Sequence, residues 1–122
     1  MVRLVFCLRR LPHLSRGEFQ RYWRERHGPL VREQARALRI RRYVQLHTAP
    51  DPSNDALRAS RGGPEAFDGV AELWWESRDE VERALATPEG RAASRVLLED
   101  ERRFIDLARS PLWWAEEQEM IP

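Results

Sequence analysis

The chain has 122 residues, enough for one domain with a substantial hydrophobic core and too few for two. No apolar run reaches the roughly 20 residues of a membrane span, and the N-terminus lacks a signal-peptide pattern, so we expect a cytoplasmic protein without membrane contacts. Cys7 is the only cysteine, which excludes an internal disulfide and a cysteine-based metal cluster.

Charge is distributed unevenly along the chain. Residues 1–61 carry 14 Arg and 5 acidic residues, whereas residues 62–122 carry 7 Arg and 15 acidic residues. Within one small domain these halves largely neutralise each other. Since no nucleic-acid-binding motif is present, we favour self-association over nucleic-acid binding.

The first expected elements are a strand and a helix. Residues 2–10 are short and rich in β-forming residues and are followed by Pro12, which predicts a strand. Ser15 and Glu18 have the spacing of a capping box, so a helix is expected over about residues 16–26.

An aromatic stripe lies along this helix. Phe19, Trp23 and His27 are spaced four residues apart and therefore share one face. Gly28 is expected to end the helix in the left-handed conformation, and Pro29 to begin a second helix. His27 then either caps the helix end or serves as a functional group at the turn, and both interpretations stay open from the spacing alone.

Residues after the second helix alternate between polar and aliphatic types, which predicts a strand over residues 40–48. Val44 and Leu46 would face the core. The opposite, polar face would be formed by Tyr43, Gln45 and His47.

A long loop is expected over residues 49–67, because this stretch contains three prolines and two glycines. Residues 70–76 predict a third strand, with Glu72 and Trp74 on the side away from the helices. Ser77 and Thr87 are the expected N-caps of two further helical segments.

The last expected strand covers residues 100–108, with Phe104 and Asp106 on one face. Residues 1–110 would form the domain. The tail, residues 111–122, contains two adjacent tryptophans and is expected to pack on the domain or on a partner chain.

This order is β-α-β-β-α-β, the ferredoxin-like α+β arrangement of one antiparallel sheet with helices on one face. The other face needs a cover, so we expect a homodimer in which two sheets meet. By strand alternation that face would form a small-molecule pocket. Its members would be Tyr43, Gln45, His47, Glu72, Trp74, Phe104 and Asp106.

His47 is the expected general base, because an imidazole titrates near neutral pH, and His27 is its candidate partner, with Trp23 in the pocket wall. The alternative is a hydrogen-bonded polar network without a substrate. A metal site is not expected, since the sequence lacks His-x-x-x-His and Glu-x-x-His spacings.

The order and spacing of several motifs closely resemble the EthD family. These motifs are His27-Gly28-Pro29, the alternating Tyr43-x-Gln45-x-His47, the run from Asp68 to Trp74, and Asp100-Glu101 followed by Phe104 and Asp106. The resemblance implies a dimeric α+β barrel that acts on small organic molecules without a tightly bound organic cofactor. It also implies an acid–base role for His27 and His47, with Tyr43, Glu72 and Trp74 lining the pocket.

The leading hypothesis is therefore a cofactor-independent lyase, dehydratase or isomerase. Two alternatives remain, a monooxygenase of the dimeric barrel type and a non-catalytic dimer that binds a small ligand.

Overall fold

A computed structural model describes all 122 residues. The elements are β1 (Val2–Leu8), α1 (Arg16–Tyr22), η1 (Trp23–His27), α2 (Gly28–Leu38), β2 (Arg42–His47), α3 (Ser53–Arg61), β3 (Gly69–Trp75), α4 (Arg78–Leu85), α5 (Pro88–Glu101), η2 (Leu107–Arg109) and β4 (Leu112–Ala115).

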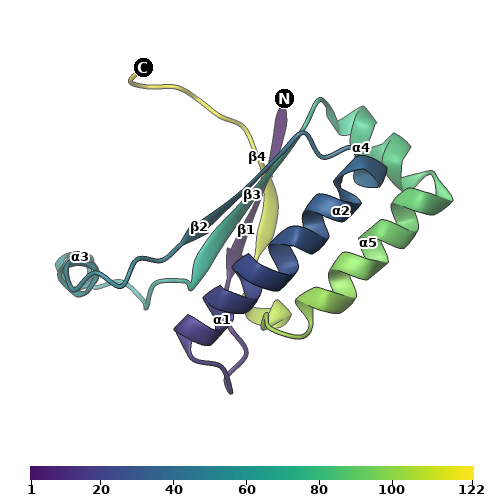
Figure 1. Cartoon of the computed structure of the whole chain (residues 1–122). Helices are drawn as coiled ribbons and strands as arrows, with labels where there is room; N and C mark the ends of the chain where they lie inside the picture. The colour runs from purple at the N-terminus through teal and green to yellow at the C-terminus, as the bar shows by residue number, and fades with distance from the viewer.

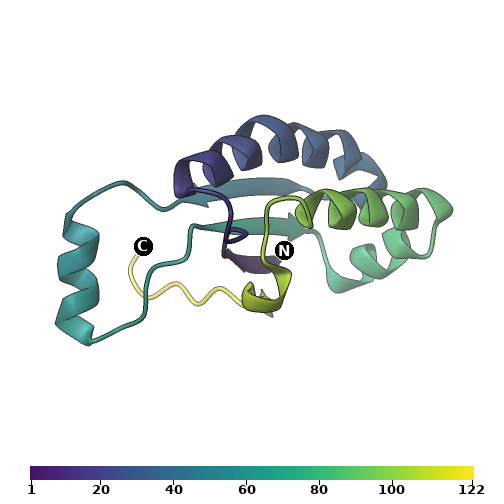
Figure 2. The ribbon, with the colours of Figure 1, turned by 90° about the horizontal axis from the view of Figure 1, so that it is seen from below.

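One antiparallel sheet with strand order β2-β3-β1-β4 forms the base of the molecule. Helices α1, α2, α4 and α5 lie in a layer on one side of it (Figures 1 and 2). This confirms the predicted ferredoxin-like α+β fold with helices on one face. None of the helices is both long and apolar enough to cross a membrane.

The expected fourth strand was misplaced. Residues 100 and 101 end α5, and the following turns bury Phe104 and Ile105 completely. The fourth strand is instead Leu112–Ala115, which pairs with β1. Side chains four residues apart on α5 form an inward-facing stripe that continues past residue 100. This stripe favours a longer helix, although the alternation of residues 100–108 had predicted a strand.

The predicted helix break at Gly28 is also wrong. Gly28 has right-handed helical angles, φ −55° and ψ −52°, and the chain passes from α1 to α2 through one π-helical turn, η1. The Gly28 N–H donates to the Trp23 carbonyl, five residues back. A π turn inserts one extra residue, which rotates the side chains after it relative to those before it. Phe19, Trp23 and His27 are all buried, as the stripe predicted.

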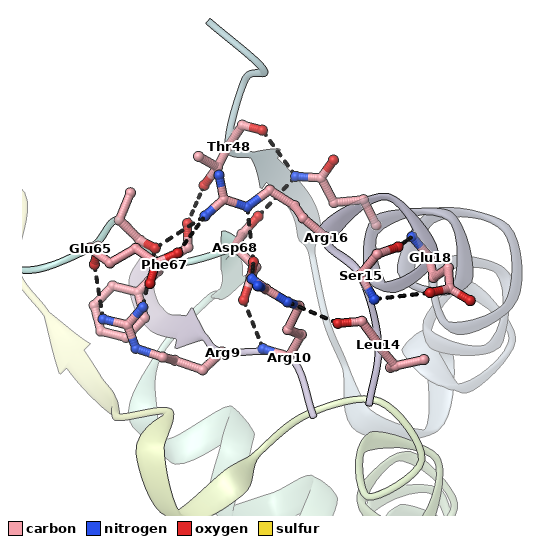
Figure 3. Close-up of polar contacts among 12 residues, drawn as sticks. Arg9, Arg10, Leu14, Ser15, Arg16, Glu18, Thr48, Glu65, Phe67 and Asp68 are labelled. Atoms are coloured by element: carbon pink, nitrogen blue, oxygen red, sulfur yellow. Dashed lines mark hydrogen bonds and ion pairs between the residues drawn. The ribbon is translucent and has the colours of Figure 1, made fainter. Parts of the chain in front are cut away.

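Residues 49–67 form an arm that contains α3, where only a loop was expected. The arm projects beyond the end of the sheet (Figures 1 and 2), and none of the α3 residues is buried. Its base is held by arginines. Arg9 donates to the carbonyls of Glu65 and Ala66, and Arg10 and Arg16 both donate to the buried carboxylate of Asp68 (Figure 3).

The core lies between the sheet and the helices. One cluster combines β1 and β3 side chains with Phe19, Trp23 and Phe104, and a second joins α2 to α5 through Val31, Leu38, Ala93 and Leu97. Gly69 lets the Trp23 ring lie directly on β3, because a Cβ on Gly69 would lie 2.4 Å from that ring. The helix layer is thereby fixed on the sheet.

Candidate active site

An apolar pocket of about 350 Å³ lies between the sheet and helices α4 and α5. Its walls come from β1, β3, β4 and both helices, and include Leu4, Leu73, Trp75, Leu97 and Trp114. The volume suits a small organic ligand, since binding pockets for such molecules usually measure about 300–1,000 Å³. We call this space the inner pocket.

A narrower cavity of about 50 Å³ adjoins the inner pocket, and most of the polar side chains of the combined space line this cavity. Both are lined by Phe6, Leu73, Leu97 and Glu101, so they meet along these side chains. The narrow part adds Trp23, Tyr43 and His27. A mainly apolar space with a few convergent polar groups is typical of a ligand-binding or active site.

The Asp100 carboxylate holds the Nδ1 atom of His27. Its Nδ1 lies 2.8 Å from Oδ2 of Asp100, and the Tyr22 hydroxyl donates to Oδ1 of the same carboxylate at 2.6 Å. The carboxylate therefore accepts an Nδ1 proton, which leaves Nε2 with its lone pair. Burial lowers the pKa of His27 and outweighs the opposite effect of Asp100, so the imidazole is neutral at pH 7.

Phe104 packs against the rings of His27 and Tyr22 and fixes their orientation. It is fully buried, and its ring lies 5.0 Å from both the His27 and the Tyr22 rings and 5.4 Å from that of Phe19. Phe104 had been expected to line a pocket. It instead packs behind His27 and limits the rotation of the imidazole.

Glu101 brings a titratable carboxyl group to the junction of the two spaces. Burial, and then the charge of the neighbouring Asp100, raise its pKa from 4.5 to about 7. Both residues lie at the C-terminal end of α5, where free carbonyls also disfavour negative charge. A carboxyl group with a pKa near neutrality can donate or accept a proton at physiological pH.

Tyr43, Gln45 and His47 form one hydrogen-bonded chain along β2. Nε2 of Gln45 donates to the Tyr43 hydroxyl at 2.8 Å and to the Trp23 carbonyl at 2.9 Å, while His47 Nε2 donates to Gln45 Oε1 at 2.8 Å. The His47 ring stacks on Trp23 at 4.5 Å. Burial raises the pKa of Tyr43 to about 12, so its phenol remains protonated.

The predicted placement of these three side chains on the uncovered sheet face is therefore wrong. They pair with Leu73, Ala71 and Gly69 of β3, and side chains directly opposite each other in a sheet share a face, here the one under the helices. The reason is that the π turn presents the Trp23 carbonyl to Gln45, which satisfies a polar side chain inside the fold. The aliphatic Val44 and Leu46 face outward instead.

His47 does not line either part of the pocket. Its Nδ1 is buried without a hydrogen-bond partner, and burial, followed by the charge of Arg24, lowers its pKa. Tyr43 and Trp23 do line the narrow cavity together with His27. The structure thus brings together three of the residues named from the sequence around the narrow cavity, whereas His47 lies outside the cavity, against Trp23 and Gln45.

Glu72 and Trp74 lie on the open sheet face, away from His27. Arg3 and Arg42 stack on the Trp74 ring at 4.5 and 4.6 Å, and Arg3 approaches Glu72 at 3.6 Å. Asp106 lies in a turn after α5, and its backbone N–H donates to the Arg9 carbonyl. No group of three or more His, Cys, Asp or Glu side chains is arranged to hold a metal ion.

Sequence reasoning assigned no role to Asp100, Glu101 or Tyr22. A signal was present for Glu101, because Ala93, Leu97 and Glu101 are spaced four residues apart and would align on one face of a helix. The expectation of a strand over residues 100–108 concealed this alignment. A carboxyl group at the end of an apolar helical stripe would have indicated a buried acid.

Comparison with known proteins identifies a family. A family model described as EthD domain matches residues 11–108. An EthD family protein from Bacillus halodurans is 19% identical, with a TM-score of 0.61, and covers 97% of this chain and 100% of its own.

Two further crystal structures share the fold. The first is SnoaB from Streptomyces nogalater, a cofactor-independent oxygenase, which is 18% identical with a TM-score of 0.55 and coverage of 99% and 96%. The second is an EthD-like protein from Ralstonia eutropha, which is 17% identical with a TM-score of 0.56 and coverage of 94% and 90%. Comparison with functionally curated proteins finds no significant match.

Proposed function

The chain belongs to the EthD family, and from this premise we propose that it is a cofactor-independent enzyme of lyase, dehydratase or isomerase type. Its substrate would be a hydrophobic, oxygenated small molecule bound in the inner pocket. The single observation that carries this proposal is the meeting of a carboxyl group of pKa about 7, Glu101, with the neutral imidazole of His27 along one apolar cavity.

In this proposal His27 is the general base. Its Nε2 removes a proton from a carbon next to the substrate carbonyl, and the Asp100 carboxylate, 2.8 Å from Nδ1, stabilises the imidazolium that forms. The Tyr22 hydroxyl holds the second oxygen of Asp100 and so fixes the direction of the carboxylate. This assignment replaces His47 as the leading base with His27.

Glu101 is the proposed acid. In its protonated form it can donate to the substrate oxygen as negative charge develops there, and the protonated phenol of Tyr43 can add a second hydrogen bond. The apolar walls strengthen both interactions, because water is excluded from the reacting atoms. His27 then returns its proton to a different carbon in an isomerisation, or to a departing hydroxyl group in a dehydration.

A homodimer is part of the proposal. The open sheet face carries Trp74 between two arginines, together with Val44 and Leu46, and half of the Leu46 surface is exposed. A second copy placed on this face would cover these side chains. The barrel of the dimer would then consist of two sheets, with one inner pocket in each protomer.

Proton exchange tests the catalytic assignment directly. Hydrophobic ketones and lactones are incubated with the protein in D₂O, and loss of the α-proton signal is followed by NMR. We expect His27→Gln and Glu101→Gln each to slow the exchange by about 10²–10⁴-fold. His13→Gln is the matched control, since His13 is exposed, and it should exchange at the wild-type rate.

The outcomes separate the hypotheses. Binding without exchange across the substrate panel would indicate a non-catalytic ligand-binding dimer. Exchange that persists in both variants would contradict the assignment of His27 and Glu101.

A cofactor-independent oxygenase is the second candidate, because SnoaB shares the fold and has that activity. The same base could generate a substrate carbanion that reacts with O₂. Oxygen consumption coupled to substrate loss, measured with an oxygen electrode, would favour this candidate over a lyase or isomerase.

A further inference from the structure

A second concave site lies outside the inner pocket, between α2 and the edge strand β2. It is a groove of about 430 Å³, and four of its lining residues are arginines. They are Arg24, Arg32, Arg41 and Arg42. No carboxylate lines the groove, so the charge of the arginines is not neutralised within it.

The guanidinium groups of Arg24, Arg32 and Arg41 remain available to a ligand, whereas that of Arg42 lies over the Trp74 ring. Arg24 approaches only Glu25, at 3.7 Å, and Arg41 only Glu76, at 3.3 Å, and all four of these side chains are more than half exposed. Surface ion pairs of this kind contribute about 0–1 kcal/mol. An incoming anion can therefore compete for both arginines, while Arg32 is exposed and has no carboxylate partner to lose.

The floor of the groove is apolar. Val31 and Ala35 of α2 and Ile40 of the following turn form it, and Tyr43 stands at its inner end. The Tyr43 hydroxyl accepts from Gln45, and its own proton has no acceptor in the protein. The groove thus offers positive charge at its rim, an apolar surface below and a free O–H donor.

This combination fits an amphiphilic anion. We propose that the groove binds the carboxylate or phosphate group of a small organic molecule whose apolar part lies on Val31, Ala35 and Ile40. Arginine recognises both kinds of oxyanion by paired N–H donors. The groove shares Val31 and Tyr43 with the narrow cavity, but neither His27 nor Glu101 lines it, and the proposal rests on arginines that have no part in the proposed catalysis.

Isothermal titration calorimetry with four probes tests the proposal. Phenylacetate and phenyl phosphate carry both parts of the ligand, inorganic phosphate lacks the apolar part, and 2-phenylethanol lacks the charge. We expect the two organic anions to bind at least about tenfold more tightly than the other two probes, with affinity falling as NaCl is raised. The tighter of the two identifies the head group as carboxylate or phosphate.

A matched pair of double variants locates the site. Arg32→Gln with Arg41→Gln should weaken binding of the organic anions by about tenfold or more, equivalent to one lost charge-assisted hydrogen bond. Arg95→Gln with Arg109→Gln removes the same charge from exposed positions outside the groove and should change binding by less than about twofold. Circular dichroism confirms that both variants are folded.

Three results would overturn the proposal. The first is equal weakening by both double variants, which would indicate a general charge effect. The second is equal binding of 2-phenylethanol and phenyl phosphate. The third is tight binding of a single-stranded oligonucleotide with no binding of the organic anions, because the groove would then serve a nucleic acid.

Discussion

Replacing Glu101 by Gln is expected to stabilise the protein at pH 8 and to leave its stability unchanged at pH 4. Burial and the Asp100 charge raise the pKa of Glu101 from 4.5 to about 7 in the folded state. Below pH 4.5 the carboxyl is protonated in both states. Between pH 4.5 and 7 only the unfolded state ionises, so folded stability falls as the pH rises, and above pH 7 the full penalty is present.

The size of the effect follows from this shift. At about 1.4 kcal/mol per pKa unit, the rise corresponds to about 3 kcal/mol as an upper value. Gln has nearly the same shape and no ionisation, so the variant lacks the penalty. We therefore expect the free energy of unfolding of Glu101→Gln to exceed that of the wild type by about 1–3 kcal/mol at pH 8. At pH 4 the two values should differ by less than about 0.5 kcal/mol.

Urea unfolding followed by tryptophan fluorescence measures both values. Glu99→Gln is the control, because Glu99 is exposed on the same helix turn and should give no pH-dependent difference. A Glu101→Gln variant that is less stable than the wild type at pH 8, or that gains the same stability at both pH values, would refute the reasoning. A stabilised variant with slower proton exchange would show that the buried acid is kept at a cost in stability.

Three further predictions concern the stability of the fold, and each is checked by the midpoint of urea unfolding. Asp68→Ala should lower the free energy of unfolding by about 2–4 kcal/mol, because two arginines lose their buried carboxylate partner. Burial alone would raise the pKa of Asp68, but hydrogen bonds from these arginines outweigh it and hold the pKa below 3.8, so the contribution of Asp68 is present above that pH and is lost as the pH falls further. Gly69→Ala should cost about 1–3 kcal/mol or more, since its Cβ would overlap the Trp23 ring; a wild-type midpoint would contradict this packing. Thr87→Ala removes the N-cap of α5 and should cost about 1 kcal/mol, whereas an unchanged midpoint would mean that water replaces the cap.

Local patterns predicted much of this fold. The capping box at Ser15 and Glu18 forms with both of its hydrogen bonds, because it depends only on residues three apart. The buried stripe of Phe19, Trp23 and His27 follows from helical periodicity in the same way. These features are set by neighbours in the chain and do not require knowledge of distant partners.

Features that depend on distant partners were missed. Leu112–Ala115 is only four residues long, and it becomes a strand because β1 has an open edge far away in sequence. The inward position of Gln45 depends on the Trp23 carbonyl of the π turn, which accepts from Gln45 as well as from the Gly28 N–H. No residue of helix α3 is buried, so no core contact marked it, and the prolines and glycines around it predicted a loop.

The π turn has a consequence for comparing distant relatives. An α-helix advances about 100° per residue, so one residue more or fewer within η1 turns α1 by that angle relative to α2. A relative without the extra residue could keep both helices and every hydrophobic position, yet its histidine would leave the cavity or its aromatic stripe would leave the core. A one-residue gap between Trp23 and His27 in an alignment would therefore mark a change of chemistry, even where the flanking sequences agree.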